Sequence, residues 1–270
     1  MRIDSLDVYQ VAMPLIYPWR TAYGEDYDVH TVLVRATSGE YVAWSESCPL
    51  FAPTYSPESA GSVFYHVSEI FGPHVVGHEY ETARDLDRRL QAFKGNPFAK
   101  AAIEICWWTL TSTITSTPLH QLLGGDTREV VTGADFGIQD SIDMLLGNIQ
   151  QAVDAGFPRV KLKVARGWDL EMLGAVRSTF PDTTFHIDCN SGYTLDDLPF
   201  FKSVDKLGLA FIEQPLHYTD VLDHAELARQ IETPICLDET IVSVKAAEQA
   251  LEKDVLGRIS ENLNASEVNA

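Results

Sequence analysis

The sequence is short of basic residues, cysteine and long apolar runs, and each shortage excludes a class of protein. Lys and Arg number 20 against 39 Asp and Glu, giving a formal net charge of −19. This balance argues against a general nucleic-acid binder, which needs basic surface to neutralise phosphates. There is no run of about 18 consecutive apolar residues, so we expect no membrane span. The first residues lack a basic segment followed by an apolar one, so we expect no secretory signal.

Cysteine is scarce and scattered. Cys48, Cys106, Cys189 and Cys236 form no CxxC pair, and this spacing fits reduced thiols in a cytoplasm better than a disulfide framework. Glycine-rich phosphate loops of the GxGxxG or GxxxxGK[ST] type are also missing. What remains is a globular composition, with 45% hydrophobic and 22% charged residues. The 270 residues suffice for one large domain or two ordinary ones.

The pattern of apolar residues changes near residue 126. Before it, near-alternating apolar residues predict antiparallel strands in the first forty or so positions, and helical patterns dominate from about 60 to 123. After it, short apolar runs alternate with amphipathic stretches, which predicts βαβ units around a parallel sheet.

The spacing of three acidic residues refines this prediction. Asp188, Glu213 and Asp238 each close an expected strand, and 213 − 188 = 25 while 238 − 213 = 25. A constant step of one strand plus one helix favours a (β/α) barrel, with a doubly wound sheet as the alternative.

These three carboxylates also suggest a metal site. At the same height on neighbouring strands they would repel one another unless a cation lay between them. Oxygen ligands select a hard ion, Mg²⁺ first and Mn²⁺ next. The alternative is that each acid is a helix cap or a solvated loop residue.

Two lysines precede the acids by one repeat. Lys161 and Lys163 fall on one face of an expected buried strand, and 188 − 163 = 25. Such a strand should be apolar, so the lysines need carboxylates or an anionic substrate opposite them. Their mutual repulsion should lower the pKa of at least one, which could then act as a base. The alternative is an edge strand that carries charge to discourage aggregation.

Four motifs together resemble a known family: KLK at 161–163, HIDCN at 186–190, FIEQP at 211–215 and CLDET at 236–240. They are similar to the enolase superfamily, muconate lactonizing enzyme subgroup, and most similar to the o-succinylbenzoate synthase / N-acylamino acid racemase family. The resemblance implies an α+β capping domain over 1–125 and an α/β (TIM-type) barrel over 126–259. The remaining residues, 260–270, form a polar tail unlike the family.

The resemblance also implies roles. Asp188, Glu213 and Asp238 would bind Mg²⁺, or Mn²⁺. Lys163 would abstract the proton α to the carboxylate of a small substrate, giving an enediolate, and Lys161 would bind that carboxylate. Asn190 and Glu239 would lie beside the ligands, and the loops around 18–24 and 49–55 would influence substrate choice.

The chain departs from the family at several places, two of which bear on the site. Asp135 stands where a small polar residue is usual, and it would line the substrate pocket. Lys253 is the last lysine, so the second catalytic lysine of the family is missing. We expect five strands and a doubtful sixth near 255–259, whereas a closed barrel needs eight. The chain is therefore interpreted as C-terminally truncated, with impaired activity and a tendency to form homo-oligomers. Two alternatives stay open: an inactive member that still binds metal, and a cycloisomerase or dipeptide epimerase.

Overall fold

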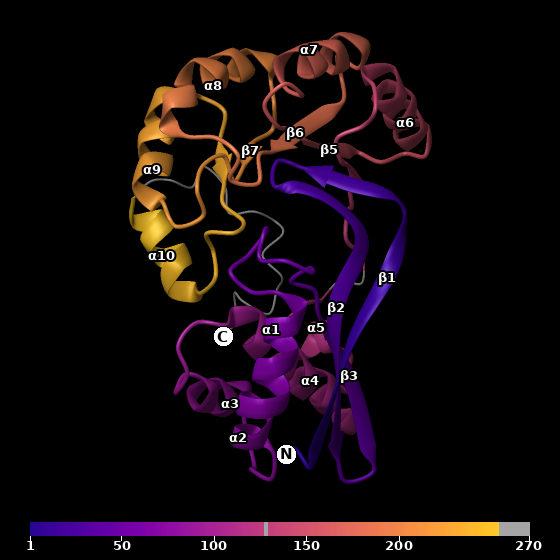
Figure 1. Ribbon diagram of the computed structural model, residues 1–270, viewed down its shortest axis with the longest axis vertical. Coiled ribbons are helices and arrows are strands. Elements are labelled where there is room, and N and C mark those ends of the chain that lie inside the picture. The colour runs from indigo at the N-terminus through magenta and orange to yellow at the C-terminus, as the bar shows by residue number, and fades with distance from the viewer. Residues whose placement is uncertain (127–128, 254–270) are drawn as a thin grey trace. The chain divides into compact units, whose positions relative to one another are not determined.

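The chain folds into two compact units (Figure 1). The computed structural model describes residues 1–126 and 129–253. One unit comprises Met1–Tyr17 and, of the described residues, 27–126; the other comprises Pro18–Asp26 and 129–253. Residues 18–26, the tip of the first hairpin, therefore group with the second unit, which no local sequence pattern indicates.

The first unit contains a three-stranded sheet, as the alternating apolar residues predict. Its strands follow one another in the order β1 (Ser5–Thr21), β2 (Gly24–Ser38) and β3 (Tyr41–Ser47). β2 and β3 pair antiparallel around a tight turn at Gly39, whose φ of 59° lies in the left-handed region that favours glycine. The predicted hairpin is confirmed.

Helices cover one face of this sheet. They are α1 (Ala60–Tyr65), the π-helical turn η1 (His66–Phe71), α2 (Gly72–Val75), α3 (Ala83–Leu90), α4 (Pro97–Thr115) and α5 (Leu119–Leu122). Alternate residues of β2, Val32, Val34 and Ala36, are fully buried and share a core with the α4 residues Ala102 and Ile103. In the described ranges, no helix is both long and apolar enough to cross a bilayer.

The second unit alternates strands and helices, as the sequence predicts. Its parallel strands, in spatial order, are β4 (Ala134–Phe136), β5 (Arg159–Lys163), β6 (Thr184–Asp188), β7 (Ile212–Glu213) and β8 (Ile235–Cys236). The intervening helices are α6 (Ile142–Asp154), α7 (Leu170–Thr179), η2 (Leu195–Asp197), α8 (Leu198–Val204), η3 (Asp205–Leu207), α9 (Val221–Gln230) and α10 (Val244–Glu252).

This unit is a (β/α)-barrel sheet of which the described residues form five strands. Figure 1 shows α6 to α10 in an arc on one side of the strands. Strand residues such as Val160, Leu162 and Phe185 join the core under these helices. The residues between them point to the opposite face, because side chains alternate along a strand. The expected sixth strand near 255–259 and the expected tail at 260–270 lie outside the described residues.

The sequence spaces Lys163, Asp188, Glu213 and Asp238 at equal steps of 25 residues, and the strand register confirms that the first two steps join residues at equal height. Lys163 is level with Asp188, and Asp188 is level with Glu213. The third step is wrong: Glu213 pairs with Cys236, and β8 ends there, two residues before Asp238. Strands of a closing sheet are staggered, so an equal step along the sequence does not secure an equal height.

Candidate active site

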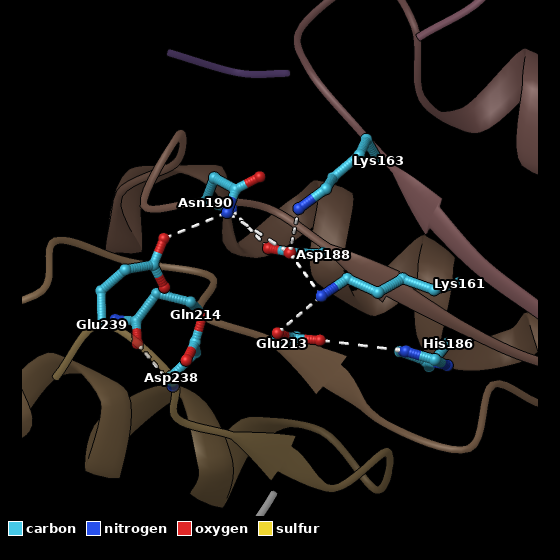
Figure 2. Close-up of polar contacts among 9 residues, drawn as sticks. All are labelled: Lys161, Lys163, His186, Asp188, Asn190, Glu213, Gln214, Asp238 and Glu239. Atoms are coloured by element: carbon cyan, nitrogen blue, oxygen red, sulfur yellow. Dashed lines mark hydrogen bonds and ion pairs between the residues drawn. The ribbon is translucent and has the colours of Figure 1, made fainter. Parts of the chain in front are cut away.

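Two lysines and two carboxylates meet at the carboxyl ends of β5, β6 and β7 (Figure 2). Lys163 Nζ lies 2.6 Å from Asp188 Oδ2. Lys161 Nζ lies 2.9 Å from the same oxygen and 2.8 Å from Glu213 Oε1, so it bridges β6 and β7. Glu213 is fully buried and Asp188 nearly so. The sequence prediction that Lys161 and Lys163 share one face opposite carboxylates is confirmed by this geometry.

The ion pairs set the protonation of Lys161 and Asp188. Burial would lower the pKa of Lys161, but the carboxylates of Asp188, Glu213 and Asp135 outweigh it and raise that pKa. Burial would raise the pKa of Asp188, but the ammonium groups of Lys163 and Lys161 hold it below its usual value. The expected lowering of a lysine pKa by mutual repulsion is therefore wrong for Lys161, because attraction to the acids exceeds repulsion between the amines.

Two further carboxyl groups are harder to ionise. Burial, then the charge of Asp188, raises the pKa of Glu213 to about 7. The same two causes, in the same order, raise the pKa of Glu239 to about 8. Asn190 Nδ2 donates to Glu239 Oε1 at 3.1 Å and to Asp188 Oδ2 at 3.3 Å, so it links the two acids. The site therefore holds more carboxyl groups than its two lysines neutralise.

The residues fit a hard divalent cation by their chemistry. All of the expected ligands offer carboxylate oxygens, and Glu213 Oε2 and Glu239 Oε2 are buried without a hydrogen-bond partner. Within residues 1–126 and 129–253, no three His, Cys, Asp or Glu side chains are already arranged to hold a metal ion. Lys161 and Lys163 instead lie against Asp188, so a cation would have to compete with these ammonium groups.

Asp238 and Asp135 lie at the margins of this group. Asp238 follows β8, and its backbone N–H donates to the side chain of Gln214, the residue after Glu213, at 2.9 Å. Asp135 lies on β4 level with Lys161. Crowding by surrounding protein atoms weakens the hydration of Asp135 and raises its pKa, although Lys163 and Lys161 oppose this and the residue stays exposed to solvent. Asp135 thus lies on a strand beside Lys161, whereas Asp238 lies in the loop after β8 and not at the strand end that the sequence predicts.

His186 lies beside Lys161 and Glu213 and is buried. It is level with Lys161 on β6, and its ring packs on Phe211 at a centroid distance of 4.2 Å. Burial, then the charge of Lys161, lowers the pKa of His186 to about 3, so its imidazole is neutral. His186 Nε2 lies 3.9 Å from Glu213 Oε2, too far for a hydrogen bond.

Sequence reasoning missed three residues of the site. Trp19, on the hairpin tip, places its ring centroid 5.9 Å from Lys163 Nζ, within cation–π range. Burial, then Asp26, Asp188 and Glu239, raises the pKa of Tyr23 to about 12, so this phenol also lies near the acids. Gln214 holds the loop after β8. For Trp19 and Tyr23 the only signal was the family expectation for the loop around 18–24, since their contacts with the acids and Lys163 span more than a hundred residues. The contacts of Gln214 with the loop after β8 span about one βα repeat, and no sequence pattern indicated them.

The parallel βα sheet, with lysines paired to acids at the carboxyl ends of its strands, defines a protein of the (β/α)-barrel class. Two family models match the sequence: mandelate racemase / muconate lactonizing enzyme, N-terminal domain, over 4–124, and enolase C-terminal domain-like, over 145–262. The chain belongs to the mandelate racemase / muconate lactonizing enzyme group of the enolase superfamily.

Individual relatives agree with this assignment. The chain is 36% identical to an N-succinylamino acid racemase of Thermus thermophilus, covering 93% of this chain and 68% of the relative. It is 35% identical to an o-succinylbenzoate synthase of Geobacillus kaustophilus, with the same coverage. A solved enolase-superfamily structure from Listeria innocua superposes with a TM-score of 0.90 at 30% identity, covering 100% of this chain and 72% of that one.

Proposed function

We propose that this protein removes the proton α to the carboxylate of a small substrate, in the manner of an o-succinylbenzoate synthase or an N-acylamino acid racemase. The observation that carries this proposal is the buried pairing of Lys163 with Asp188 at the carboxyl edge of a parallel sheet, beside Glu213. Buried amines beside a surplus of carboxyl groups are costly for a purely structural role, and they are suited to proton transfer.

In this proposal Asp188, Glu213 and Asp238 would hold Mg²⁺ or Mn²⁺. A bound divalent cation would withdraw charge from the substrate carboxylate and so acidify the α-proton. Binding of the cation would compete for Asp188 Oδ2, the oxygen that both lysines contact. Lys163, once released from its ion pair, would give its ammonium proton to solvent and as the free amine would accept the α-proton at Nζ. Lys161 would provide positive charge for the substrate carboxylate.

The relatives support the substrate class. N-succinylamino acids and the succinylbenzoate precursor both carry a carboxylate next to the carbon that loses its proton. The same proton abstraction would also serve a cycloisomerase or a dipeptide epimerase of the superfamily, which act on other carboxylate substrates. Elimination needs one base, whereas racemisation needs a base on each face, and Lys161 and Lys163 both come from β5.

The decisive experiment follows loss of the α-proton signal of N-succinylamino acids in D₂O with Mg²⁺, by proton NMR. We expect exchange with the unaltered protein and a loss of at least about 100-fold with Lys163→Ala, since a general base contributes about that much. Lys202→Ala, on the exposed surface of α8, is the matched control and should leave the rate unchanged. Exchange that survives Lys163→Ala would refute the assignment of the base.

A second candidate is a catalytically inactive member that binds metal. It is favoured by the ion pair itself, because an ammonium held 2.6 Å from Asp188 cannot accept a proton. The same experiment separates the two candidates. Mg²⁺ binding without exchange of N-succinylamino acids, succinylbenzoate precursor or dipeptides would support the inactive member.

We also propose that the protein works in the cytoplasm as a homo-oligomer. Val130 and Val131, which precede the edge strand β4, are 80% and 76% exposed, and exposed apolar residues at a sheet edge favour association. Sedimentation velocity measures this directly. A single monomeric species at micromolar concentration would show the oligomer to be wrong.

A further inference from the structure

Gln214 follows Glu213 directly and is completely buried. Its side-chain amide joins the end of β7 to the loop after β8. Oε1 accepts the backbone N–H groups of Asp238 at 2.9 Å and Thr240 at 3.2 Å. Nε2 donates to Thr240 Oγ1 at 2.8 Å and to Leu216 O at 3.2 Å. Both lone pairs and both protons of the amide are therefore used.

The backbone of Gln214 reinforces this arrangement. Its φ is 36°, in the left-handed region that residues other than glycine rarely adopt. Such a conformation persists only where the surroundings determine it, and here the backbone N–H of Gln214 donates to Cys236 O at 2.8 Å. The turn out of β7 and the amide together fasten the start of the next loop to β7.

The fastened loop carries two of the acids of the site. Asp238 is hydrogen-bonded to Gln214 through its backbone N–H (Figure 2). Glu239 lies in the chain between Asp238 and Thr240, the two residues whose N–H groups Gln214 accepts. β8 itself is only two residues long, and it ends before Asp238. Pairing between β7 and β8 therefore cannot fix the position of Asp238 and Glu239 relative to Glu213. The hydrogen bonds of the Gln214 amide fix it instead.

We propose that Gln214 is a positioning residue that holds Asp238 and Glu239 beside Glu213 for cation binding. This inference rests on the proposed function, since it assumes that the acids bind a divalent ion. Residues that orient metal ligands typically contribute roughly 10- to 100-fold to metal affinity. Gln214 contacts the backbone of Asp238, so it acts on the site without touching the substrate or the ion.

The test compares Gln214→Met with the unaltered protein by two measurements. Met preserves the volume of the side chain and removes all four hydrogen bonds. Electron paramagnetic resonance titration with Mn²⁺ should show binding weakened at least about tenfold. Hydrogen–deuterium exchange should show faster exchange of the Asp238 and Thr240 amides. Gln214→Glu keeps the two acceptor bonds, so it should retain most of the amide protection.

The opposite end of β8 offers a matched control. Asp205 accepts the backbone N–H of Thr233 at 2.7 Å and that of Glu232 at 3.1 Å, so it fixes the residues just before β8. Asp205→Ala should destabilise the protein while leaving the Mn²⁺ affinity within about twofold. Thr240→Val removes only one of the four bonds, and it should weaken Mn²⁺ binding in the same direction by less, even if Gln214→Met fails to fold.

The outcomes are distinguishable. Unchanged Mn²⁺ affinity in Gln214→Met and Thr240→Val overturns the positioning role while the proposed function stands. An equal loss of affinity in Asp205→Ala also overturns it, because the effect would then be general destabilisation. If the unaltered protein binds no Mn²⁺, the cation site of the proposed function fails. Amide hydrogen–deuterium exchange then tests by itself whether Gln214 holds the loop after β8. If the Asp238 and Thr240 amides exchange at the same rate in Gln214→Met as in the unaltered protein, the positioning role is overturned.

Discussion

Lys163 and Asp188 face each other across the β5–β6 pair, with Nζ 2.6 Å from Oδ2 and with little access to solvent. Their equal height follows from the register of the two strands. Lys161 contacts the same oxygen, so one carboxylate carries two ammonium groups while Glu213 shares one of them. Removing one of these buried charges should therefore lower the free energy of unfolding, because its partner would be left buried without a counter-charge.

The first prediction concerns Lys161→Met in protein freed of metal ions. Removing the ammonium leaves Glu213 without its ion pair in a buried site, and we expect the free energy of unfolding to fall by about 3 kcal/mol. Urea denaturation measures it, with Lys202→Met as the control. Mg²⁺ should restore part of the loss, because a cation replaces the missing charge. An unchanged urea midpoint would contradict the prediction.

The second prediction concerns pH and His224, which is completely buried. Its Nε2 accepts the N–H of Leu216 at 3.1 Å, so its ring is neutral and its Nδ1 donates to Asp220 O. Burial lowers the pKa of His224 below 6.5. The unfolded chain then binds more protons than the folded one at pH values between the folded pKa and 6.5. This contribution to stability is complete above pH 6.5 and is lost as the pH falls through that window.

His224→Gln provides the test, because glutamine can make the same two hydrogen bonds and does not titrate. We expect stability at pH 8 to change by less than about 1 kcal/mol. Between pH 7 and pH 5 the unaltered protein should lose more stability than the variant, as measured by urea denaturation at each pH. Parallel pH profiles would show that His224 does not carry this dependence.

The third prediction concerns Asp135, which lies level with Lys161 on the neighbouring strand. Its negative charge opposes an anionic substrate, so Asp135→Asn should lower the KM for N-succinylamino acids by about fivefold, or about 1 kcal/mol for one charge removed at close range. Steady-state kinetics at low ionic strength measure it. Asp182→Asn makes the same change of net charge on the exposed turn before β6, and it should leave KM unaltered. Equal effects of the two variants would contradict a local role.

The fourth prediction concerns the first unit. Asn96, the N-cap residue that precedes α4, makes no capping hydrogen bond with its side chain. Glu58 takes its place by accepting the N–H groups of Phe98 at 2.7 Å and Ala99 at 3.1 Å. Glu58→Ala should lower the free energy of unfolding by about 2 kcal/mol, since it leaves two donors of the helix without a partner.

Glu58→Gln is the matched variant, because it retains one acceptor oxygen. It should cost clearly less than Glu58→Ala in thermal and urea denaturation. Equal losses for the two variants would indicate that packing, and not the hydrogen bonds to α4, accounts for the effect.

Much of the candidate site was predictable from local patterns. Asp188 and Glu213 end short apolar strands, and their step of 25 residues, shared with Lys163, placed all three in one row. The prediction failed at the next strand, where Asp238 lies beyond the end of β8. Strand stagger depends on how the whole sheet closes, so the spacing of one pair cannot give it.

The sequence by itself determined the order of strands and helices, the facing of lysines and acids, and membership of the enolase superfamily. These features rest on periodicity and on short motifs, which are local. Only the tertiary structure decided that Gln214 holds the loop of Asp238, that Trp19 lies over Lys163, and that Lys161 is more basic than usual. Each of these depends on contacts between residues far apart in the chain, and a pKa depends on the sum of the charges gathered around a group.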